Sequence, residues 1–335
     1  MSAQKIILDC DPGIDDALAI VFAHGDPSLE LAGITTVAGN VGLESTTANA
    51  LRVTELLGAE LPVVAGSPGP LLGGPLREML DARHAHGEDG LAGARLPPAV
   101  TRPRDGHAVD FILGETAAAP GEITLVATGP LTNIALAVRR DPALVSRVRD
   151  FVIMGGSATR GNVTPAAEFN IGADPEAAAI VFSAGWRVTM VGLDVTLRAR
   201  AGRAVLDRMR GLGRLADDLL LPTLARFGPD PSPIPSPVPG PDAGPAVHDV
   251  CAVARVARPG LIGCAEARVD IETCGRLTAG MTVTDFRGNP EERNALVATD
   301  IDTGGFWDLV IGAYARAAAA VPALPAGGPG VRAGM

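Results

Sequence analysis

Lysine is almost absent from this chain, and cysteines and aromatic residues are few. Lys5 is the only lysine among 335 residues, so mechanisms that need a catalytic lysine have almost no candidate. The four cysteines show no C-x-x-C spacing, which argues against a zinc site and a disulfide framework; they are Cys10, Cys251, Cys264 and Cys274. The longest uncharged stretch is too short to span a bilayer, and the residues before the first strand-like run show no signal-peptide pattern. We therefore expect a soluble, cytoplasmic protein.

The composition is that of a globular protein with an acidic charge balance. Hydrophobic residues make up 47% of the chain, charged residues make up 20%, and the formal net charge is −10. An acidic protein is a poor partner for nucleic acid or an anionic membrane, so we expect small or neutral partners. The length suits one large domain, which we place at residues 1–320, followed by a flexible tail at 321–335.

Short apolar runs alternate with longer amphipathic stretches along the chain. This alternation predicts an α/β fold with a mainly parallel, Rossmann-like open sheet and helices on both of its faces. The predicted strands are 5–10, 31–37, 123–128, 151–156 and 187–194, and the predicted helices are 15–24, 43–57, 131–140, 175–183 and 201–209. Ligands of such sheets bind beyond the carboxyl ends of the strands, where four of these runs end in small or polar residues. We expect the active site there.

Two segments interrupt this alternation. Residues 66–107 are rich in Gly, Pro and Arg and contain His84, His86 and His107, which predicts a long loop over the top edge of the sheet. Residues 228–245 contain prolines at a density that excludes a helix or a central strand. We interpret this second segment as a loop over the active site.

Four carboxylates stand within eight residues at the end of the first predicted strand: Asp9, Asp11, Asp15 and Asp16. Carboxylates crowded at a buried strand end need a counter-charge, and a ligand set made only of oxygen suits calcium or magnesium. A plainer alternative is that Asp15 and Asp16 cap a helix while Asp9 and Asp11 are solvated. A phosphotransferase of the haloacid-dehalogenase type is the strongest rival enzyme. That enzyme type needs a Lys or Arg to neutralise its phosphoryl aspartate, and Lys5 stands at the opposite end of the predicted strand from the acids, which leaves only an unassigned arginine.

The octet DCDPGIDD resembles the N-terminal signature of the inosine-uridine-type nucleoside hydrolase family. Further segments resemble that family in the same order: ITTVAGNV at 34–41, HAHGEDG at 84–90, ATGPLTNIALA at 127–137, VIMGG at 152–156, GNVTPAAEFNIGADPEAA at 161–178 and AVHDVCAV at 246–253. The resemblance covers nearly the whole chain, to about residue 318. It implies a single-domain nucleoside hydrolase fold, in agreement with the sheet pattern.

The resemblance also implies a role for each matching residue. It implies a calcium ion held by Asp11, Asp16, the backbone carbonyl of Thr128 and Asp249, with Asp9 orienting these ligands from behind. It further implies that Asp11 is the general base that takes a proton from the attacking water, and that His248 is the acid that protonates the departing base. The residues that it places around the nucleoside are Asp15, Asn40, His84, Met154, Asn162, Glu168, Asn170 and Asp249.

The implied reaction splits a purine or pyrimidine ribonucleoside into free base and ribose, with inversion at C1′. Positive charge develops on the sugar in the transition state, and a ring of carboxylates and amides stabilises that charge. The resemblance also implies a homodimer or a homotetramer. A calcium-dependent nucleoside-binding protein without turnover remains the non-enzymatic alternative.

One segment departs from the family pattern. Many members supply a base-contacting tyrosine just before the His-Asp motif, where this chain has its Pro-rich run and its only tyrosine is Tyr314. An aromatic contact from this side would have to come from Phe227. The preferred nucleobase is therefore left open.

Overall fold

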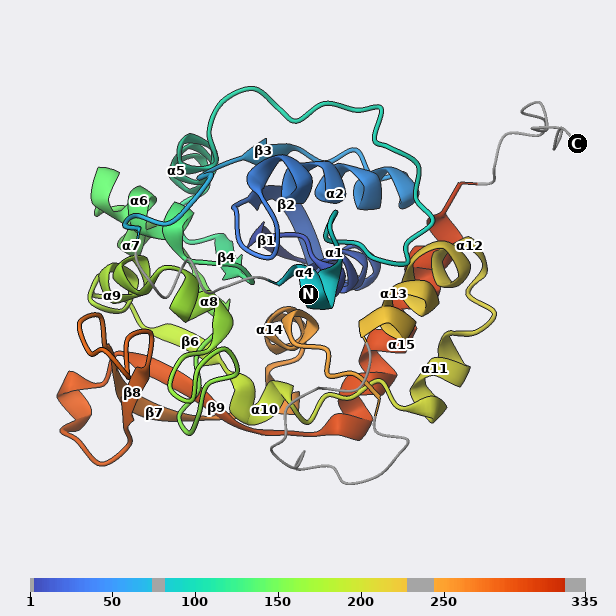
Figure 1. Ribbon diagram of the computed structural model, residues 1–335. Coiled ribbons are helices and arrows are strands. Elements are labelled where there is room, and N and C mark those ends of the chain that lie inside the picture. The colour runs from blue at the N-terminus through green and yellow to red at the C-terminus, as the bar shows by residue number, and fades with distance from the viewer. Residues whose placement is uncertain (1–2, 74–81, 228–243, 323–335) are drawn as a thin grey trace, which may run out of the picture.

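The computed structural model describes residues 3–73, 82–227 and 244–322. Most of the Pro-rich segment predicted as a loop over the active site, and most of the predicted tail, lie outside these residues. The described chain forms one domain around a central sheet, with helices on both sides (Figure 1). This confirms the fold class and the single domain that the sequence predicts.

The described strands form one sheet of nine, in the order β3-β2-β1-β4-β5-β6-β9-β7-β8. Their bounds are β1 Gln4–Cys10, β2 Leu29–Thr36, β3 Val63–Ala65, β4 Ile123–Ala127, β5 Asp150–Met154, β6 Val188–Val191, β7 Ile262–Ile271, β8 Thr282–Asp285 and β9 Ala295–Ile301. The pairs from β3 through to β9 are parallel, whereas β7 pairs antiparallel with both β9 and β8. The first six strands therefore follow the Rossmann order.

Alternate side chains of the central strands enter two separate cores. Ile6 and Leu8 of β1 point to one face of the sheet, while Ile7 points to the other. In β5, Val152 and Met154 enter the same core as Ile6 and Leu8. Phe151 and Ile153 enter the core on the other face, together with Ile7. Because successive side chains of a strand point to opposite faces, a strand covered on both faces must be apolar throughout. This explains the unbroken apolar runs in the sequence.

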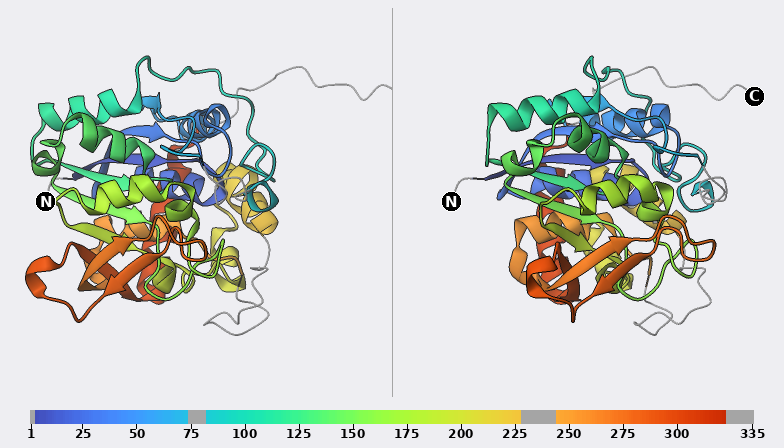
Figure 2. Two further views of the ribbon diagram at one scale, coloured as in Figure 1. Left: turned by 60° about the vertical axis from the view of Figure 1, so that its left-hand side comes forward. Right: turned by 90° about the vertical axis from the view of Figure 1, so that its left-hand side faces the viewer.

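Helices cover both faces of the sheet (Figure 2). The first core contains α1, α2, α14 and α15, and the second contains α5, α6 and α9. The helix bounds are α1 Ile14–Gly25, α2 Leu43–Leu56, α4 Arg83–His86, α5 Ala108–Ala118, α6 Thr132–Arg140, α7 Leu144–Arg147, α8 Phe169–Ala173, α9 Pro175–Phe182, α10 Leu193–Thr196, α11 Arg203–Met209, α12 Gly213–Leu215, η1 Ala216–Leu220, α13 Leu221–Phe227, α14 Asp249–Ala257, η2 Pro259–Leu261, η3 Pro290–Glu292 and α15 Thr303–Ala320. The five predicted strands and five predicted helices are all present.

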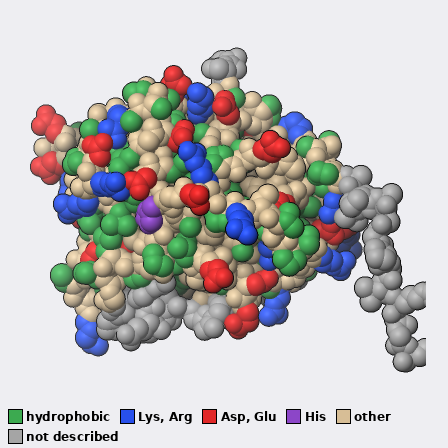
Figure 3. Space-filling view, turned by 90° about the horizontal axis from the view of Figure 1, so that it is seen from above, with side chains coloured by type: hydrophobic (Ala, Val, Ile, Leu, Met, Phe, Trp, Pro, Cys, Tyr) green, Lys and Arg blue, Asp and Glu red, His purple; other side chains and the backbone are tan. Residues whose placement is uncertain are grey.

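The surface carries charges of both signs. Acidic and basic side chains are interspersed on the face seen from above, with no broad field of one sign there (Figure 3). Among the described residues, no helix is both long enough and apolar enough to cross a membrane.

Candidate active site

The acidic octet forms a strand, a tight turn and a helix. β1 ends at Cys10, and α1 begins at Ile14. Gly13 has no side chain to cap the helix, so the carboxylate of Asp16 accepts its backbone N–H at 3.1 Å. Nδ1 of His86 accepts the next free N–H, that of Ile14, at 3.0 Å. The first turn of α1 is therefore held by a carboxylate of its own and by an imidazole from a distant loop.

Asp11 lies at the centre of this turn and is fully buried. Its Oδ2 accepts the backbone N–H of Asn40 at 2.6 Å, while its Oδ1 has no hydrogen-bond partner among the described residues. Backbone at Gly39 and Gly129 passes directly over the carboxylate, and a Cβ at either position would collide with it. A buried carboxylate oxygen without a donor costs free energy, so this atom is a candidate for a ligand contact.

Asp16 connects the ends of three segments. Its Oδ1 accepts the hydroxyl of Thr128, just beyond β4, at 2.9 Å, and its Oδ2 accepts the side-chain amide of Asn40, beyond β2, at 3.2 Å. Since Asp16 itself follows β1, the structure brings together the carboxyl ends of three neighbouring strands. These candidate residues therefore meet at the edge of the sheet where the sequence predicts the site.

A cluster of three buried carboxylates could hold a metal ion. Oxygen atoms of Asp15, Asp16 and Asp249 lie within 4.8 Å of one another. Asp249 begins α14, which brings this distant part of the chain to the first strand end. The cluster contains Asp15, which the resemblance assigns to the sugar. Asp11 borders the cluster without belonging to it, because its backbone N–H donates to Oδ1 of Asp16 at 3.3 Å. An all-oxygen set of this kind suits a hard cation.

Burial and mutual repulsion raise the pKa values of these acids. Burial, followed by the charge of Asp16, raises the pKa of Asp15 to about 7. The same two causes hold the pKa of Asp11 well above its ordinary value, and burial with the charge of Asp15 does so for Asp249. A bound cation would reverse this balance because it favours the charged carboxylates.

Asp9 lies behind the turn and is tied to the sheet. Its Oδ1 accepts the hydroxyl of Thr35 at 2.6 Å and the side-chain amide of Asn133 at 2.8 Å. Burial nevertheless raises its pKa to about 7. Asn133 also donates to the carbonyl of Thr36 and accepts the N–H of Ser67, so one amide connects four segments. Sequence reasoning did not identify Asn133, although its motif was among those that resemble the family.

Among the residues assigned to the sugar, Asn170 and Glu168 are buried and Asn162 is exposed. Asn170 donates its side-chain amide to the carbonyls of Thr128 at 2.7 Å and Met154 at 3.0 Å, so it lies beside the acidic cluster. Glu168 is also buried, but its carboxylate accepts three backbone N–H groups, those of Gly156, Asn170 and Ile171. Asn162 is exposed and accepts the N–H of Phe169.

His248 stands next to Asp249 at the start of α14. Its Nδ1 lies 2.8 Å from the hydroxyl of Thr196, a contact that the sequence did not indicate. His84 lies in α4, and its side chain falls outside the described residues, as does the side chain of Phe227. Tyr314 is fully buried in α15 and donates its hydroxyl to the carbonyl of Leu18. The only tyrosine is therefore part of the core.

Residues 6–308 match the family model described as inosine-uridine preferring nucleoside hydrolase. The chain belongs to this nucleoside hydrolase family. It is similar to the inosine-uridine preferring nucleoside hydrolase of Leishmania major, with 46% identity over 93% of this chain and 98% of the relative. It is also similar to the pyrimidine-specific ribonucleoside hydrolase RihA of Salmonella gallinarum, with 40% identity over 92% of this chain and 97% of the relative.

Solved structures agree with this assignment. The purine-preferring ribonucleoside hydrolase of Gardnerella vaginalis superposes with a TM-score of 0.83 at 31% identity, covering 94% of this chain and 99% of that one. As a member of the nucleoside hydrolase family, the present chain is an enzyme of the class that cleaves N-glycosidic bonds. The match along nearly the whole chain leaves the haloacid-dehalogenase-type phosphatase without support.

Proposed function

We propose that this nucleoside hydrolase uses a calcium ion and Asp11 to split ribonucleosides into free base and ribose. One observation carries the proposal: Oδ1 of Asp11 is buried without a hydrogen-bond partner among the described residues, at the edge of the cluster formed by Asp15, Asp16 and Asp249. Such an oxygen can accept a proton or contact a cation. The large majority of buried polar side-chain atoms have a hydrogen-bond partner, so an unpartnered oxygen beside this cluster supports a ligand contact.

The residues present fit a hard cation. The clustered carboxylates offer only oxygen atoms as metal ligands, and we assign the ion to Asp11, Asp16, the carbonyl of Thr128 and Asp249. Asn170 donates to the Thr128 carbonyl, and a carbonyl oxygen has a second lone pair for a ligand. When bound, calcium supplies a positive charge that orients a water molecule and lowers its pKa.

The side chains around the ion would bind the sugar and move the proton. In this proposal Asp15 binds the ribose diol. Asn40 holds Asp11 and Asp16 beside the sugar, and Asn170 holds the carbonyls of Thr128 and Met154. This binding orients C1′ toward the water. Oδ1 of Asp11 takes the proton from that water as it attacks. The buried carboxylates stabilise the positive charge that develops on the sugar. Attack from the face opposite the base predicts inversion at C1′.

The departing base needs a proton on its own side of the sugar. We assign this proton to His248, because histidine titrates near neutral pH and Asp249, its neighbour, belongs to the acidic cluster. Its Nδ1 faces the hydroxyl of Thr196. That contact orients the ring.

The preferred base, the oligomer and the compartment remain predictions. The relatives are called inosine-uridine preferring, pyrimidine-specific or purine-preferring, so they point to no single base. We keep the homodimer or homotetramer and the cytoplasm as expectations. Gel filtration and cell fractionation test them.

The deciding experiment measures reducing-sugar release from inosine, uridine, adenosine and cytidine, without phosphate, before and after removal of calcium by a chelator. We expect release that stops on chelation and returns with calcium, and the four rates would rank the bases. Binding of nucleosides without release, by folded calcium-loaded protein, would instead establish the non-catalytic alternative. Release that continues after complete chelation would refute the role of the metal.

A further inference from the structure

The described part of the long loop between β3 and α5 packs directly on the turn that carries the acids. Nδ1 of His86 accepts the N–H of Ile14, as described above. Gly90 approaches the same turn with a φ of +86°, and a Cβ on Gly90 would lie 3.2 Å from the carbonyl oxygen of Pro12. This close approach requires glycine at position 90. The loop segment therefore forms a fixed wall of the site.

Asn49, on α2, lies between the turn and this loop. Its side-chain nitrogen donates to the carbonyl of Pro12 at 3.0 Å and to the carbonyl of Asp89 at 2.6 Å. Asn49 is 1% exposed, so its side-chain amide nitrogen is shielded from bulk water. An amide nitrogen has two hydrogens, and here each hydrogen has its own carbonyl. One side chain thus joins two segments that lie 37 and 40 positions away from it along the chain.

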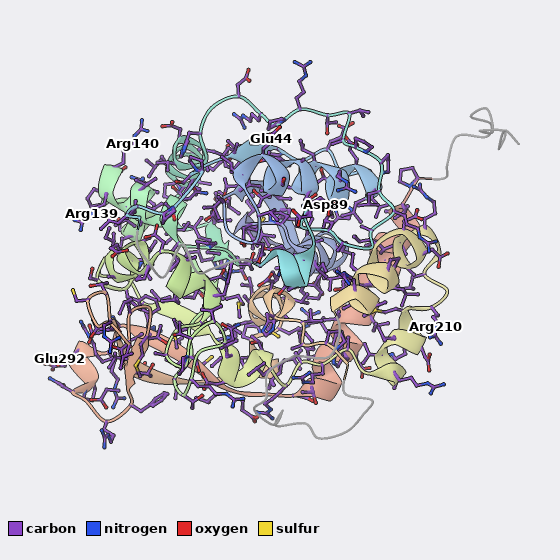
Figure 4. The ribbon with its side chains drawn as sticks, viewed as in Figure 1. Glu44, Asp89, Arg139, Arg140, Arg210 and Glu292 are labelled. Carbon is purple, nitrogen blue, oxygen red and sulfur yellow. The ribbon has the colours of Figure 1, made fainter. Side chains whose placement is uncertain are left out.

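A neighbouring arginine fixes which way the Asn49 amide points. Nη1 of Arg52 donates to Oδ1 of Asn49 at 3.2 Å and to the carboxylate of Asp89 at 3.3 Å. With its oxygen committed to Arg52, the amide must turn its nitrogen toward Pro12 and Asp89. Asp89 lies between α2 and α4 in Figure 4. The arrangement is specific, because a flipped amide would leave both carbonyls facing an oxygen.

We propose that Asn49 is a positioning residue for the reaction, one that holds the turn at residues 11–14 in register with the loop at 86–90. This inference rests on the proposed function, because the turn carries Asp11, the proposed general base. None of the hydrogen bonds given above joins Asn49 to the carboxylates of the site, which are those of Asp11, Asp15, Asp16 and Asp249. It acts on the backbone of Pro12, one residue beyond Asp11, and thereby fixes where Oδ1 of Asp11 stands. Small errors in such placement reduce turnover strongly.

A matched pair of substitutions on α2 tests the proposal. Asn49→Asp keeps the size of the side chain and the contact with Arg52, but it places an oxygen against both carbonyls. Glu55→Ala is the control, because Glu55 holds the outer part of the same loop through the N–H groups of Val100 and Thr101, at 2.9 and 2.6 Å. Both changes loosen the loop, and only the first reaches the turn. Asn49→Ala removes the donor without repulsion and serves if Asn49→Asp fails to fold.

We expect the Asn49 substitution to lower kcat by about tenfold or more, in line with loss of orientation, while KM changes by less than about threefold. Glu55→Ala should leave kcat within about twofold of wild type, although both variants lose thermal stability. Equal kcat in the Asn49 and Glu55 variants would overturn the proposal, since a purely structural role predicts equal effects.

Hydrogen exchange of the calcium-free protein gives a readout that does not depend on turnover. In the Asn49 variant, exchange should accelerate together in residues 13–16 and 86–91. In Glu55→Ala, acceleration should be confined to residues 97–104. Unchanged exchange at residues 13–16 in the Asn49 variant would refute the proposed connection. A wild-type protein that cleaves no nucleoside would refute the proposed function instead, and the exchange experiment would still test the role of Asn49.

Discussion

Asn40 holds one oxygen of Asp11 and leaves the other available. Its backbone N–H donates to Oδ2 at 2.6 Å, and Oδ1 has no hydrogen-bond partner among the described residues. The side-chain amide of Asn40 also donates to Asp16, so Asn40 fixes the position of both acids at once. This asymmetry within one carboxylate is what a general base needs, because one oxygen is oriented while the other can take a proton.

Asp11→Asn should leave the fold intact and abolish most of the activity. The asparagine has the same shape, and its Oδ1 can accept the Asn40 N–H, but the amide cannot take a proton from water. We expect kcat to fall by at least about a hundredfold, as loss of a general base predicts. Circular dichroism and reducing-sugar release on the same sample check this. Near-wild-type activity would remove Asp11 from the mechanism.

The raised pKa values predict how the metal-free protein responds to pH. Burial raises the pKa of Asp9 and of Asp15 from 3.8 to about 7, so each group binds a proton more tightly in the folded than in the unfolded chain. Their contribution to stability is complete below the unfolded value and is lost as the pH rises from about 4 through about 7. We expect chelated protein to have a lower Tm at about pH 8 than at about pH 5.5.

Asp9→Asn provides the control for this pH dependence. The side-chain carbonyl of the introduced asparagine can accept the hydroxyl of Thr35 and the amide of Asn133, which now donate to Asp9, and it carries no charge. The variant should therefore show a smaller decrease in Tm between the two pH values. Saturating calcium should oppose the decrease in wild type, because the cation favours ionised acids. A pH dependence identical in the variant and wild type would show that Asp9 does not titrate in this range.

Glu168→Gln tests whether that carboxylate serves the fold. All three groups that it binds are backbone N–H donors, and a glutamine nitrogen facing any of them would replace attraction by repulsion. We expect the free energy of unfolding to fall by about 1–3 kcal/mol, as for a lost buried hydrogen bond. Urea unfolding measures it. Glu44→Gln, at an exposed position labelled in Figure 4, should change it by less than about 0.5 kcal/mol.

The family resemblance implies that Glu168 lies near the 5′-hydroxyl of the ribose, and this role makes a separate prediction. If the side chain contacts that hydroxyl, Glu168→Gln should weaken the binding of uridine more than that of 5′-deoxyuridine. Equal losses for the two nucleosides would assign Glu168 to the fold alone.

The sequence predicts the central strands because the pattern that indicates each one lies within its own few residues. A strand segment buried on both faces needs apolar side chains on both faces, and residues 6–8 of β1, 125–127 of β4 and 151–154 of β5 show this in the sequence. β7 and β8 mix buried and exposed residues, so they lack such a run and were not among the predicted strands. The antiparallel edge of the sheet depends on pairing between distant segments, which periodicity does not indicate.

The residues of the site also divide into those that the sequence indicates and those that only the fold reveals. Asp11, Asp15 and Asp16 are evident because crowded carboxylates are unusual at a buried strand end. Asn133 and Asn49 are ordinary helix residues in the sequence, and only the fold shows that Asn133 donates to an acid 124 positions away. Similarly, His84 and His86 are neighbours in one motif, and only the structure places Nδ1 of His86 on the turn.

His248 should matter only when the leaving group needs a proton. A nucleobase departs poorly as an anion, so His248→Gln should lower kcat/KM for inosine or uridine by about a hundredfold or more. The 4-nitrophenolate of 4-nitrophenyl riboside departs without protonation, so the same variant should cleave that substrate within a fewfold of wild type. Thr196→Val, which removes the hydroxyl beside Nδ1, should show the same selectivity with smaller losses. Equal losses on both substrates would instead mean that His248 maintains the site's geometry and that another group protonates the base.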